Sequence, residues 1–291
     1  MKASPFIKWA GGKRQILKHL ISSLDKFRNY HEPFLGGGAL FFELYNRNMI
    51  NKAYLYDYNI ELINTYNVVR TDVFSLINEL KNPLYKNEKG AFYKIRSLGV
   101  NNNIQGAARF IYLNKTAYNG LYRVNSEGKF NAPFGKYDRI TLVDQEKLLL
   151  DSKALQKAEL LACDFSEVTK YAKKDDLIYF DPPYQPLSKT SNFTSYTDKC
   201  FSENDQVRLA EVFKGLVAKG CNVMLSNSNT KLIHELYAEY NIEEVYANRA
   251  INSKGNKRGK ISELIVRSWK SKQIRLFKPE DQIISSINNR Y

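Results

Sequence analysis

The sequence is poor in the residues that build disulfide frameworks and metal sites. Its 291 residues include only three cysteines, Cys163, Cys200 and Cys221, which are odd in number and widely spaced, so we expect no disulfide framework. None of them follows a proline or lies beside a histidine that could act as a base, and we interpret all three as small apolar packing residues. The three histidines show no metal-ligand spacing, so we expect no metal.

Long apolar runs and acidic residues are also scarce. No run approaches the ~20 apolar residues of a membrane span. The first residues lack the apolar stretch of a signal peptide, so we expect a cytoplasmic protein without a membrane partner. Lysine and arginine number 44 against 30 acidic residues, for a net charge of +14. This excess favours a polyanionic partner through counterion release, although many basic surfaces only aid solubility.

The chain instead has the composition of a globular protein, and one short apolar run dominates its pattern. Leu177 to Phe180 reads as a buried central strand, and Asp-Pro-Pro-Tyr at 181–184 ends it, because proline cannot donate to a sheet ladder. Open α/β sheets bind ligands at the carboxyl ends of such strands. Asp181 and the carbonyl of Pro182 could accept both hydrogens of a planar amine such as that of adenine, while Tyr184 stacks on the ring. A simple proline turn is the alternative for these four residues alone.

The first segment offers a second candidate site. Gly11-Gly12-Lys13 invites comparison with a phosphate-binding P-loop, but Ile7 and Arg14 stand where that motif needs glycine and serine or threonine. The P-loop interpretation therefore fails. Trp9 and Lys13 instead place a stacking surface and a cation around a glycine turn, which suits a ligand with a base and a carboxylate.

A glycine turn and a strand-end acid point to a nucleoside cofactor. Three glycines at 36–38 let the backbone approach a ligand closely, and the apolar strand 54–56 ends about twenty residues later in Asp57. A carboxylate at such a strand end can hold ribose hydroxyls. The strand 158–162 leads to Asp164 and Phe165, a third strand end with an acid.

The segment from Pro83 to about Asp144 differs in composition. Asparagine, glutamine, tyrosine, lysine and arginine dominate it, and only 107–113 has a helical pattern. Amides and arginine read base edges and aromatic rings stack or wedge, so we interpret it as an inserted domain that touches DNA. A loop-rich insertion without a function fits the composition equally well.

The remaining chain predicts an alternating α/β order. We expect a helix after Lys13, helices at 60–80, 166–172, 203–219 and 230–240, and strands at 222–225, 243–248 and 261–268. Residues 185–199 predict a mobile loop over the site. Residues 249–260 carry five cations and form either a solvated hairpin or one that contacts phosphates.

Five segments in order resemble the Dam-type DNA adenine methyltransferases of the alpha group, and most closely the GATC methylases of Dpn-type restriction-modification systems. The resemblance runs from residue 5 to about 270, and the segments that carry it are 6–13, 32–42, 118–125, 181–184 and 258–266. It implies a Rossmann-like S-adenosylmethionine-dependent methyltransferase sheet with an inserted, mainly helical DNA-recognition domain. The expected division is a catalytic domain of 1–80 and 145–270, a recognition domain of 81–144, and a tail of 271–291 with no assigned role.

The resemblance also assigns residues to the site. The catalytic set is Asp181, Pro182, Pro183 and Tyr184. The set expected to hold S-adenosylmethionine is Trp9, Lys13, Phe34, Gly36, Gly38, Asp57, Asp164, Phe165 and Asp181. The set expected to touch DNA is Lys8, Tyr118, Asn119, Leu121, Arg123, Asn125, Pro133, Arg249, Lys257 and Arg258.

The implied reaction is direct methyl transfer from S-adenosylmethionine to adenine N6 in double-stranded DNA, within GATC, leaving S-adenosylhomocysteine. The enzyme would act as a monomer or weak dimer, either beside a cognate restriction endonuclease or as an orphan methylase. Three alternatives stay open: a cytosine-N4 methyltransferase, an RNA adenine methyltransferase, and a catalytically silent DNA-binding protein of the same fold.

Overall fold

The computed structural model describes residues 1–9, 11, 13, 15–22, 24–186, 201–248 and 260–270. Three predicted DNA contacts, Arg249, Lys257 and Arg258, lie outside these residues, as do most of the predicted loop 185–199 and the tail 271–291. For residues 247, 248, 260 and 261 only the backbone is described.

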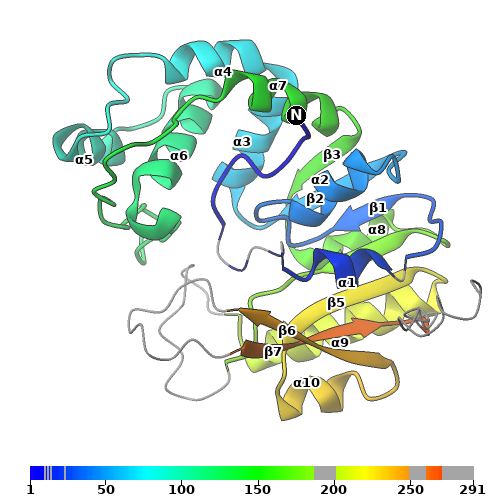
Figure 1. Ribbon diagram of the computed structural model, residues 1–291. Coiled ribbons are helices and arrows are strands. Elements are labelled where there is room, and N and C mark those ends of the chain that lie inside the picture. The colour runs from blue at the N-terminus through cyan, green and yellow to red at the C-terminus, as the bar shows by residue number, and fades with distance from the viewer. Residues whose placement is uncertain are drawn as a thin grey trace, which may run out of the picture.

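A seven-stranded sheet forms the centre of the protein, with the order β3-β2-β1-β4-β5-β7-β6 (Figure 1). The first five strands run parallel, and β7 lies antiparallel between β5 and β6. The strands are β1 (Tyr30–Glu32), β2 (Ala53–Asp57), β3 (Ala158–Ala162), β4 (Leu177–Phe180), β5 (Asn222–Ser228), β6 (Asn241–Asn248) and β7 (Lys260–Arg267). The predicted Rossmann-like α/β class is confirmed.

Strand order reverses between β1 and β4, which are neighbours in the sheet although about 145 residues separate them in sequence. The chain moves outward from β1 to β3 on one side, and from β4 to β5 on the other. The carboxyl ends of β1 and β4 therefore meet at the switch point, where α/β sheets bind ligands. Glu32 and Asp181 lie at these two ends.

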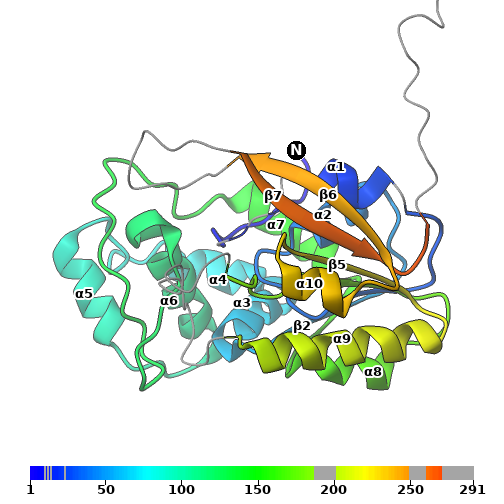
Figure 2. The ribbon, with the colours of Figure 1, turned by 90° about the horizontal axis from the view of Figure 1, so that it is seen from below.

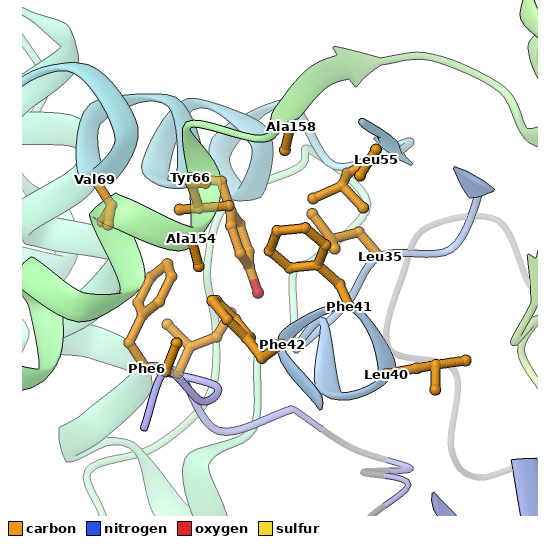
Figure 3. Packing of buried hydrophobic residues seen from close by; sticks show 14 of the residues in the cluster. Phe6, Leu35, Leu40, Phe41, Phe42, Leu55, Tyr66, Val69, Ala154 and Ala158 are labelled. Atoms are coloured by element: carbon orange, nitrogen blue, oxygen red, sulfur yellow. The ribbon is translucent and has the colours of Figure 1, made fainter. Parts of the chain in front are cut away.

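Helices cover both faces of the sheet, and the side chains of β4 alternate between them. Helices α8 (Val168–Tyr171) and α9 (Glu203–Ala218) lie together on one face of the sheet (Figure 2). Ile178 and Phe180 pack with residues of these two helices, whereas Leu177 and Tyr179 enter the larger core with α2 (Ala39–Asn46), α3 (Ile60–Thr71) and α7 (Gln145–Leu155). The larger core also holds Phe41 (Figure 3). The helices are α1 (Leu17–Ser22), α2 (Ala39–Asn46), α3 (Ile60–Thr71), α4 (Val73–Leu80), α5 (Lys89–Ser97), α6 (Asn103–Thr116), α7 (Gln145–Leu155), α8 (Val168–Tyr171), α9 (Glu203–Ala218) and α10 (Lys231–Leu236), with 3-10 turns η1 (Tyr118–Gly120) and η2 (Phe165–Glu167).

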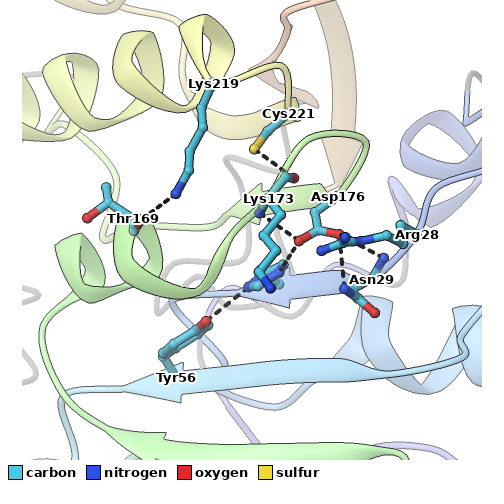
Figure 4. A network of polar contacts seen from close by, with 9 residues as sticks. Arg28, Asn29, Tyr56, Thr169, Lys173, Asp176, Lys219 and Cys221 are labelled. Carbon is cyan, nitrogen blue, oxygen red and sulfur yellow. Dashed lines mark hydrogen bonds and ion pairs between the residues drawn. The ribbon is translucent and has the colours of Figure 1, made fainter.

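A buried polar network holds the opposite, amino ends of β1 and β4 together (Figure 4). Asp176 accepts hydrogen bonds from Arg28 Nε and Asn29 Nδ2, each at 3.1 Å, and its Oδ2 lies 3.1 Å from His31 Nε2. Burial raises the pKa of Asp176, but these bonds outweigh it and hold the pKa at about 2. The ionised carboxylate thereby fixes the spacing of the two strands that carry the switch point.

Two predicted helices differ in extent from the observed ones: 230–240 forms α10 only from Lys231 to Leu236, and 60–80 is interrupted. Residues 60–80 form two helices, α3 and α4, rather than one, and Asp72 separates them with φ −146° and ψ 47°. An aspartate side chain competes with helical backbone bonds, and the break turns Val73 and Leu76 of α4 into the core. Helix α5 and helix α7 were not predicted.

The segment 81–144 extends to one side of the sheet (Figure 1). It contains α5 and α6, followed by a hairpin that encloses η1 and is closed by bridges from Ala117 to Phe134 and from Val124 to Phe130. Phe92 and Leu113 belong to a small core of its own, whereas Phe110 of α6 packs in the main core. Helix α6 therefore ties this segment to the sheet domain, and the predicted domain division stays a prediction.

Candidate active site

The carboxylate of Asp181 lies at the carboxyl end of β4, one residue beyond the last strand residue, Phe180. Lys13 Nζ lies 2.9 Å from Asp181 Oδ1, and Ser226 Oγ of β5 donates to the same oxygen at 2.8 Å. Lys13 is itself 7% exposed, so the ion pair is largely shielded from water. Burial raises the pKa of Asp181, and the charge and hydrogen bond of Lys13 oppose the rise.

The ring of Tyr184 lies under the same lysine. Lys13 Nζ lies 4.7 Å from the centre of the Tyr184 ring, and the Tyr184 hydroxyl donates to Glu263 Oε2 of β7 at 3.0 Å. A single nitrogen thus contacts both the carboxylate of Asp181 and the face of the tyrosine. This edge of the sheet can therefore bind an N–H group between an acceptor and an aromatic face.

The proline pair is held from α9. Gln206 Nε2 donates to the carbonyl of Pro183 at 3.1 Å, and Asn227 Nδ2 donates to Gln206 Oε1 at 3.0 Å. Pro182 is buried. Buried amides and a rigid proline backbone leave this turn little freedom, which suits a site that must aim carbonyl groups.

A second carboxyl group is buried beside this site. Glu32 ends β1 and is 3% exposed, and the Tyr30 hydroxyl donates to its Oε2 at 2.9 Å. Burial raises the pKa of Glu32 to about 8, although the Tyr30 hydrogen bond opposes the shift. Glu32 is therefore largely neutral at pH 7 and adds little charge next to Asp181.

The glycine turn after β1 contacts both Trp9 and Asp57. Gly36 has a φ of 46°, and a Cβ added there would lie 2.6 Å from Trp9 Cδ1, so only glycine fits beneath the indole. The Gly36 amide donates to Asp57 Oδ2 at 3.0 Å. Gly38, with φ of 63°, precedes α2. The structure thus brings Trp9, the glycine turn and the acid at the end of β2 together.

The third strand end forms an aromatic and ionic cluster. Phe34 stacks on Phe165 with ring centres 5.3 Å apart, and the guanidinium of Arg208 from α9 lies 4.1 Å from the Phe165 ring centre. Arg208 also binds both oxygens of Asp164, at 2.7 and 3.0 Å. Burial raises the pKa of Asp164, but Arg208 and Ser166 outweigh it and lower the pKa to about 2.

A buried asparagine joins the N-terminal segment to the hairpin. Asn114 of α6 accepts from the Lys8 amide at 2.8 Å and donates to the Lys8 carbonyl at 2.7 Å, and it also donates to the Gly120 carbonyl at 3.3 Å. The Lys8 side chain is exposed, and its Nζ lies over the Tyr137 ring. Lys8 is therefore a neighbour of the turn 118–120, which carries the predicted DNA contacts Tyr118 and Asn119 and is here called the recognition turn.

The predicted DNA contacts on the hairpin differ in how free their side chains are. Tyr118 is 53% exposed, and its amide donates to the carbonyl of the exposed Pro133 at 2.8 Å. Arg123 bonds to Asn131, through Oδ1 at 2.6 Å and the carbonyl at 3.1 Å. The side chain of Asn125 accepts two backbone amides and closes the hairpin turn, so contact with a base would compete with these bonds.

Two other predicted contacts follow the tyrosine in the chain. Asn119 adopts a left-handed conformation with φ of 55°, and Leu121 packs against the small core of this segment. Asn119 is exposed in the turn that carries Tyr118, whereas Leu121 is partly buried.

Four residues that shape the site were not predicted from the sequence. Ser226 holds Asp181, Glu263 holds Tyr184, Arg208 holds Asp164, and Asn114 holds Lys8. Ser226 lies on β5, which pairs with the central strand β4, and Glu263 lies on β7, which pairs with β5. Polar residues within apolar strands were the available signal. Arg208 and Asn114 lie on helices, and nothing in the local pattern indicates their partners.

Neither a metal centre nor a membrane-spanning helix occurs in the described part of the chain. No group of three or more His, Cys, Asp and Glu side chains there could hold a metal ion. No described helix is long and apolar enough to cross a bilayer.

Comparison with known proteins gives a consistent family. A family model described as D12 class N6 adenine-specific DNA methyltransferase matches residues 9–251. The chain is 43% identical over 274 residues to the Type II methyltransferase M1.LlaDCHI of Lactococcus lactis subsp. cremoris, covering 91% of this chain and 95% of that protein. It is 42% identical over 289 residues to the Type II methyltransferase M.MjaIII of Methanocaldococcus jannaschii, covering 92% and 100%. It is 36% identical over 270 residues to a DNA adenine methylase of Vibrio cholerae, covering 91% and 95%.

Proposed function

The chain belongs to the D12 class of N6 adenine-specific DNA methyltransferases, and we propose that its methyl transfer takes place at the Asp181 edge of the sheet. One observation carries this assignment. The ammonium group of Lys13 lies 2.9 Å from Asp181 and 4.7 Å from the Tyr184 ring centre, so the two groups converge on one nitrogen. An N–H group of a substrate can make contacts of the same two kinds, with the carboxylate and with the ring face.

The chemistry at this edge is acceptance of amine hydrogens. The lone pair of adenine N6 is delocalised into the ring, which makes the amine a poor nucleophile. Asp181 and the carbonyl of Pro182 accept the two amine hydrogens and draw the lone pair back onto nitrogen, while Tyr184 stacks on the base. Pro183 fixes the turn through its contact with Gln206. Orientation and electrostatics then supply most of the rate acceleration.

The residues around the glycine turn fit S-adenosylmethionine, which supplies an electrophilic methyl group when bound and leaves as S-adenosylhomocysteine. Gly36 gives the close backbone approach that a nucleoside needs, and Asp57 at the end of β2 offers acceptors to ribose hydroxyls. Lys13 is placed to bind the carboxylate of the cofactor in addition to that of Asp181. The full set that would hold the cofactor is Trp9, Lys13, Phe34, Gly36, Gly38, Asp57, Asp164, Phe165 and Asp181.

Double-stranded DNA is the proposed partner. The net charge of +14 favours it, and Lys8 lies beside the turn that exposes Tyr118. The target adenine leaves the duplex to reach Asp181, at a cost of a few kcal/mol. We assign recognition to residues 81–144 together with Lys8, and the recognised sequence to GATC, as in Dpn-type methylases.

The setting is a further part of this proposal. Two relatives carry the name Type II methyltransferase, which supports a modification enzyme paired in function with a restriction endonuclease. We propose action as a monomer or weak dimer, in the cytoplasm where DNA is accessible.

Single-molecule sequencing tests the proposed function. The gene is expressed in a host without adenine methylation, and modified bases are mapped to their context. N6-methyladenine confined to GATC supports reaction and specificity together. Methylation in another context refutes the recognition sequence only, whereas N4-methylcytosine, methylated RNA with untouched DNA, or no methylation by soluble protein refutes the reaction.

A further inference from the structure

Asp181 receives a hydrogen bond for which the proposed reaction does not account. Asp181 and Ser226 each follow the last paired residues of the parallel strands β4 and β5, Phe180 and Leu225, so they are neighbours across the sheet. Ser226 Oγ donates to Asp181 Oδ1 at 2.8 Å and lies 2.9 Å from the Tyr179 hydroxyl. Ser226 and Tyr179 are at most 1% exposed, so water does not replace these bonds.

The direction of this chain of hydroxyl groups follows from counting hydrogens. A serine hydroxyl carries one hydrogen, and Ser226 gives it to Asp181. Toward Tyr179, Ser226 can then only accept, so the tyrosine donates. The chain runs from Tyr179 through Ser226 to Asp181, with a single arrangement of its protons.

Lys13 and Ser226 together occupy one oxygen of the carboxylate. Both donate to Asp181 Oδ1, at 2.9 and 2.8 Å. Within the described residues, no side chain donates to Oδ2. Oδ2 is therefore the oxygen that remains for a hydrogen of the target amine.

We propose that Ser226 is a positioning residue for methyl transfer, whose hydroxyl fixes the orientation of Asp181 so that Oδ2 accepts the amine hydrogen. This inference rests on the proposed function, because it requires Asp181 to bind the target adenine. The proposed role of Ser226 requires no contact with the base or the cofactor. Ser226 acts through the carboxylate.

The titratable groups around Asp181 set the sign of a pH test. They are Lys13 before α1, Tyr30 and Glu32 of β1, Tyr179 of β4, and Tyr184 with its partner Glu263 of β7. Burial raises the pKa of Asp181, and the donors Lys13 and Ser226 lower it. Removing the serine hydroxyl therefore raises this pKa. The rate requires the ionised carboxylate, so its decline at acid pH then begins at a higher pH.

The decisive variant is Ser226→Ala, assayed with S-adenosylmethionine and a duplex containing GATC. We expect kcat to fall about 10- to 100-fold, the worth of one hydrogen bond to a charged group. KM for both substrates and the calorimetric Kd for S-adenosylmethionine should stay within about twofold, since binding does not use Ser226. The acid limb of the kcat profile should move to higher pH.

Three controls separate positioning from packing. Ser226→Thr keeps the hydroxyl, so it should retain most of kcat and return the acid limb of the kcat profile to its wild-type position. Tyr179→Phe keeps the hydrogen bond from Ser226 to Asp181, so it should lower kcat less than Ser226→Ala does. Ser228→Ala removes a serine on the same strand whose hydroxyl bonds to the Gln185 carbonyl, and should leave the acid limb in place.

Two results overturn the inference. The first is a Ser226→Ala enzyme with wild-type kcat and an unmoved acid limb. The second is a loss of kcat accompanied by an equal weakening of S-adenosylmethionine binding and no rescue by threonine, which indicates a packing role. Failure of the proposed function looks different: wild-type protein makes no N6-methyladenine, or Asp181→Asn keeps the wild-type rate.

Discussion

The ammonium group of Lys13 forms an ion pair with Asp181 while lying over the ring of Tyr184. Lys13 comes from the segment that also carries Trp9, whereas Asp181 and Tyr184 follow the central strand. One buried lysine thus joins the residues proposed to hold S-adenosylmethionine to those proposed to hold adenine. The two binding regions meet at this side chain, and its loss should affect both.

Lys13→Met should weaken S-adenosylmethionine binding about tenfold or more, because a charged hydrogen-bond donor is lost from a buried site. It should also move the acid limb of kcat to higher pH, since Lys13 lowers the pKa of Asp181. Isothermal calorimetry measures the first effect. The matched control is Lys8→Met, an exposed lysine of the same segment, which should leave cofactor affinity intact and weaken DNA binding. Equal cofactor affinity in wild type and Lys13→Met would contradict the assignment.

Glu32 should make the protein less stable as pH rises. Its pKa is about 8 in the folded protein against 4.5 ordinarily, so the folded state holds a proton there between these values and the unfolded chain does not. The free energy of unfolding therefore falls as pH rises from about 4.5 to 8, by at most about 5 kcal/mol.

Glu32→Gln keeps an acceptor for the Tyr30 hydroxyl and removes the ionisation. Urea denaturation at pH 5 and pH 8 should show a smaller difference for this variant than for wild type. At pH 8 the variant should be the more stable of the two. A difference of the same size in both proteins would show that Glu32 does not dominate the pH dependence.

Arg208→Met should weaken S-adenosylmethionine binding by altering Asp164 and Phe165. The arginine binds both carboxylate oxygens of Asp164 and covers the Phe165 ring. Without it the pKa of Asp164 rises from about 2, and the carboxylate is free to rotate. Because Arg208 and Asp164 are substantially exposed, we expect a loss of only about two- to fivefold in affinity. The control is Arg47→Met, which breaks a surface ion pair with Glu43 and should bind S-adenosylmethionine with wild-type affinity.

Asn114→Ala should separate Lys8 from the recognition turn. Asn114 is fully buried, and its removal leaves the Lys8 amide, the Lys8 carbonyl and the Gly120 carbonyl without a partner, at about 1–3 kcal/mol of stability for each group left unsatisfied. Discrimination between GATC and altered duplexes should fall, measured by fluorescence anisotropy. Asn114→Asp keeps only the hydrogen-bond acceptor, so its discrimination should lie between that of wild type and that of Asn114→Ala. Wild-type discrimination in a folded Asn114→Ala protein would exclude this role.

Most of the sheet could be predicted because its strands carry local signals. The strand 158–162 and the central strand 177–180 were predicted with their observed bounds, since each is an apolar run with a clear stop. Helices α5 and α7 were not predicted because charged and polar residues interrupt the apolar residues of each. The break at Asp72 was missed because the apolar pattern continues through it.

The positions of the acidic site residues at strand ends could be predicted, but the side chains that contact them could not. Strand-end acids indicated where Asp57, Asp164 and Asp181 belong, because parallel strands end at one edge. The partners of these acids could not be predicted. Arg208 lies 44 residues from Asp164, and Ser226 lies 45 residues from Asp181, so only the packing of α9 and β5 brings them together.

The most direct test of the account is the product formed by wild type and Asp181→Ala on the same duplex. Each protein is incubated with labelled S-adenosylmethionine and GATC-containing DNA, and the DNA is digested to nucleosides. We predict that wild type yields labelled N6-methyldeoxyadenosine and that Asp181→Ala yields none, although the variant still binds DNA. Methylation by Asp181→Ala at near the wild-type rate would contradict the account.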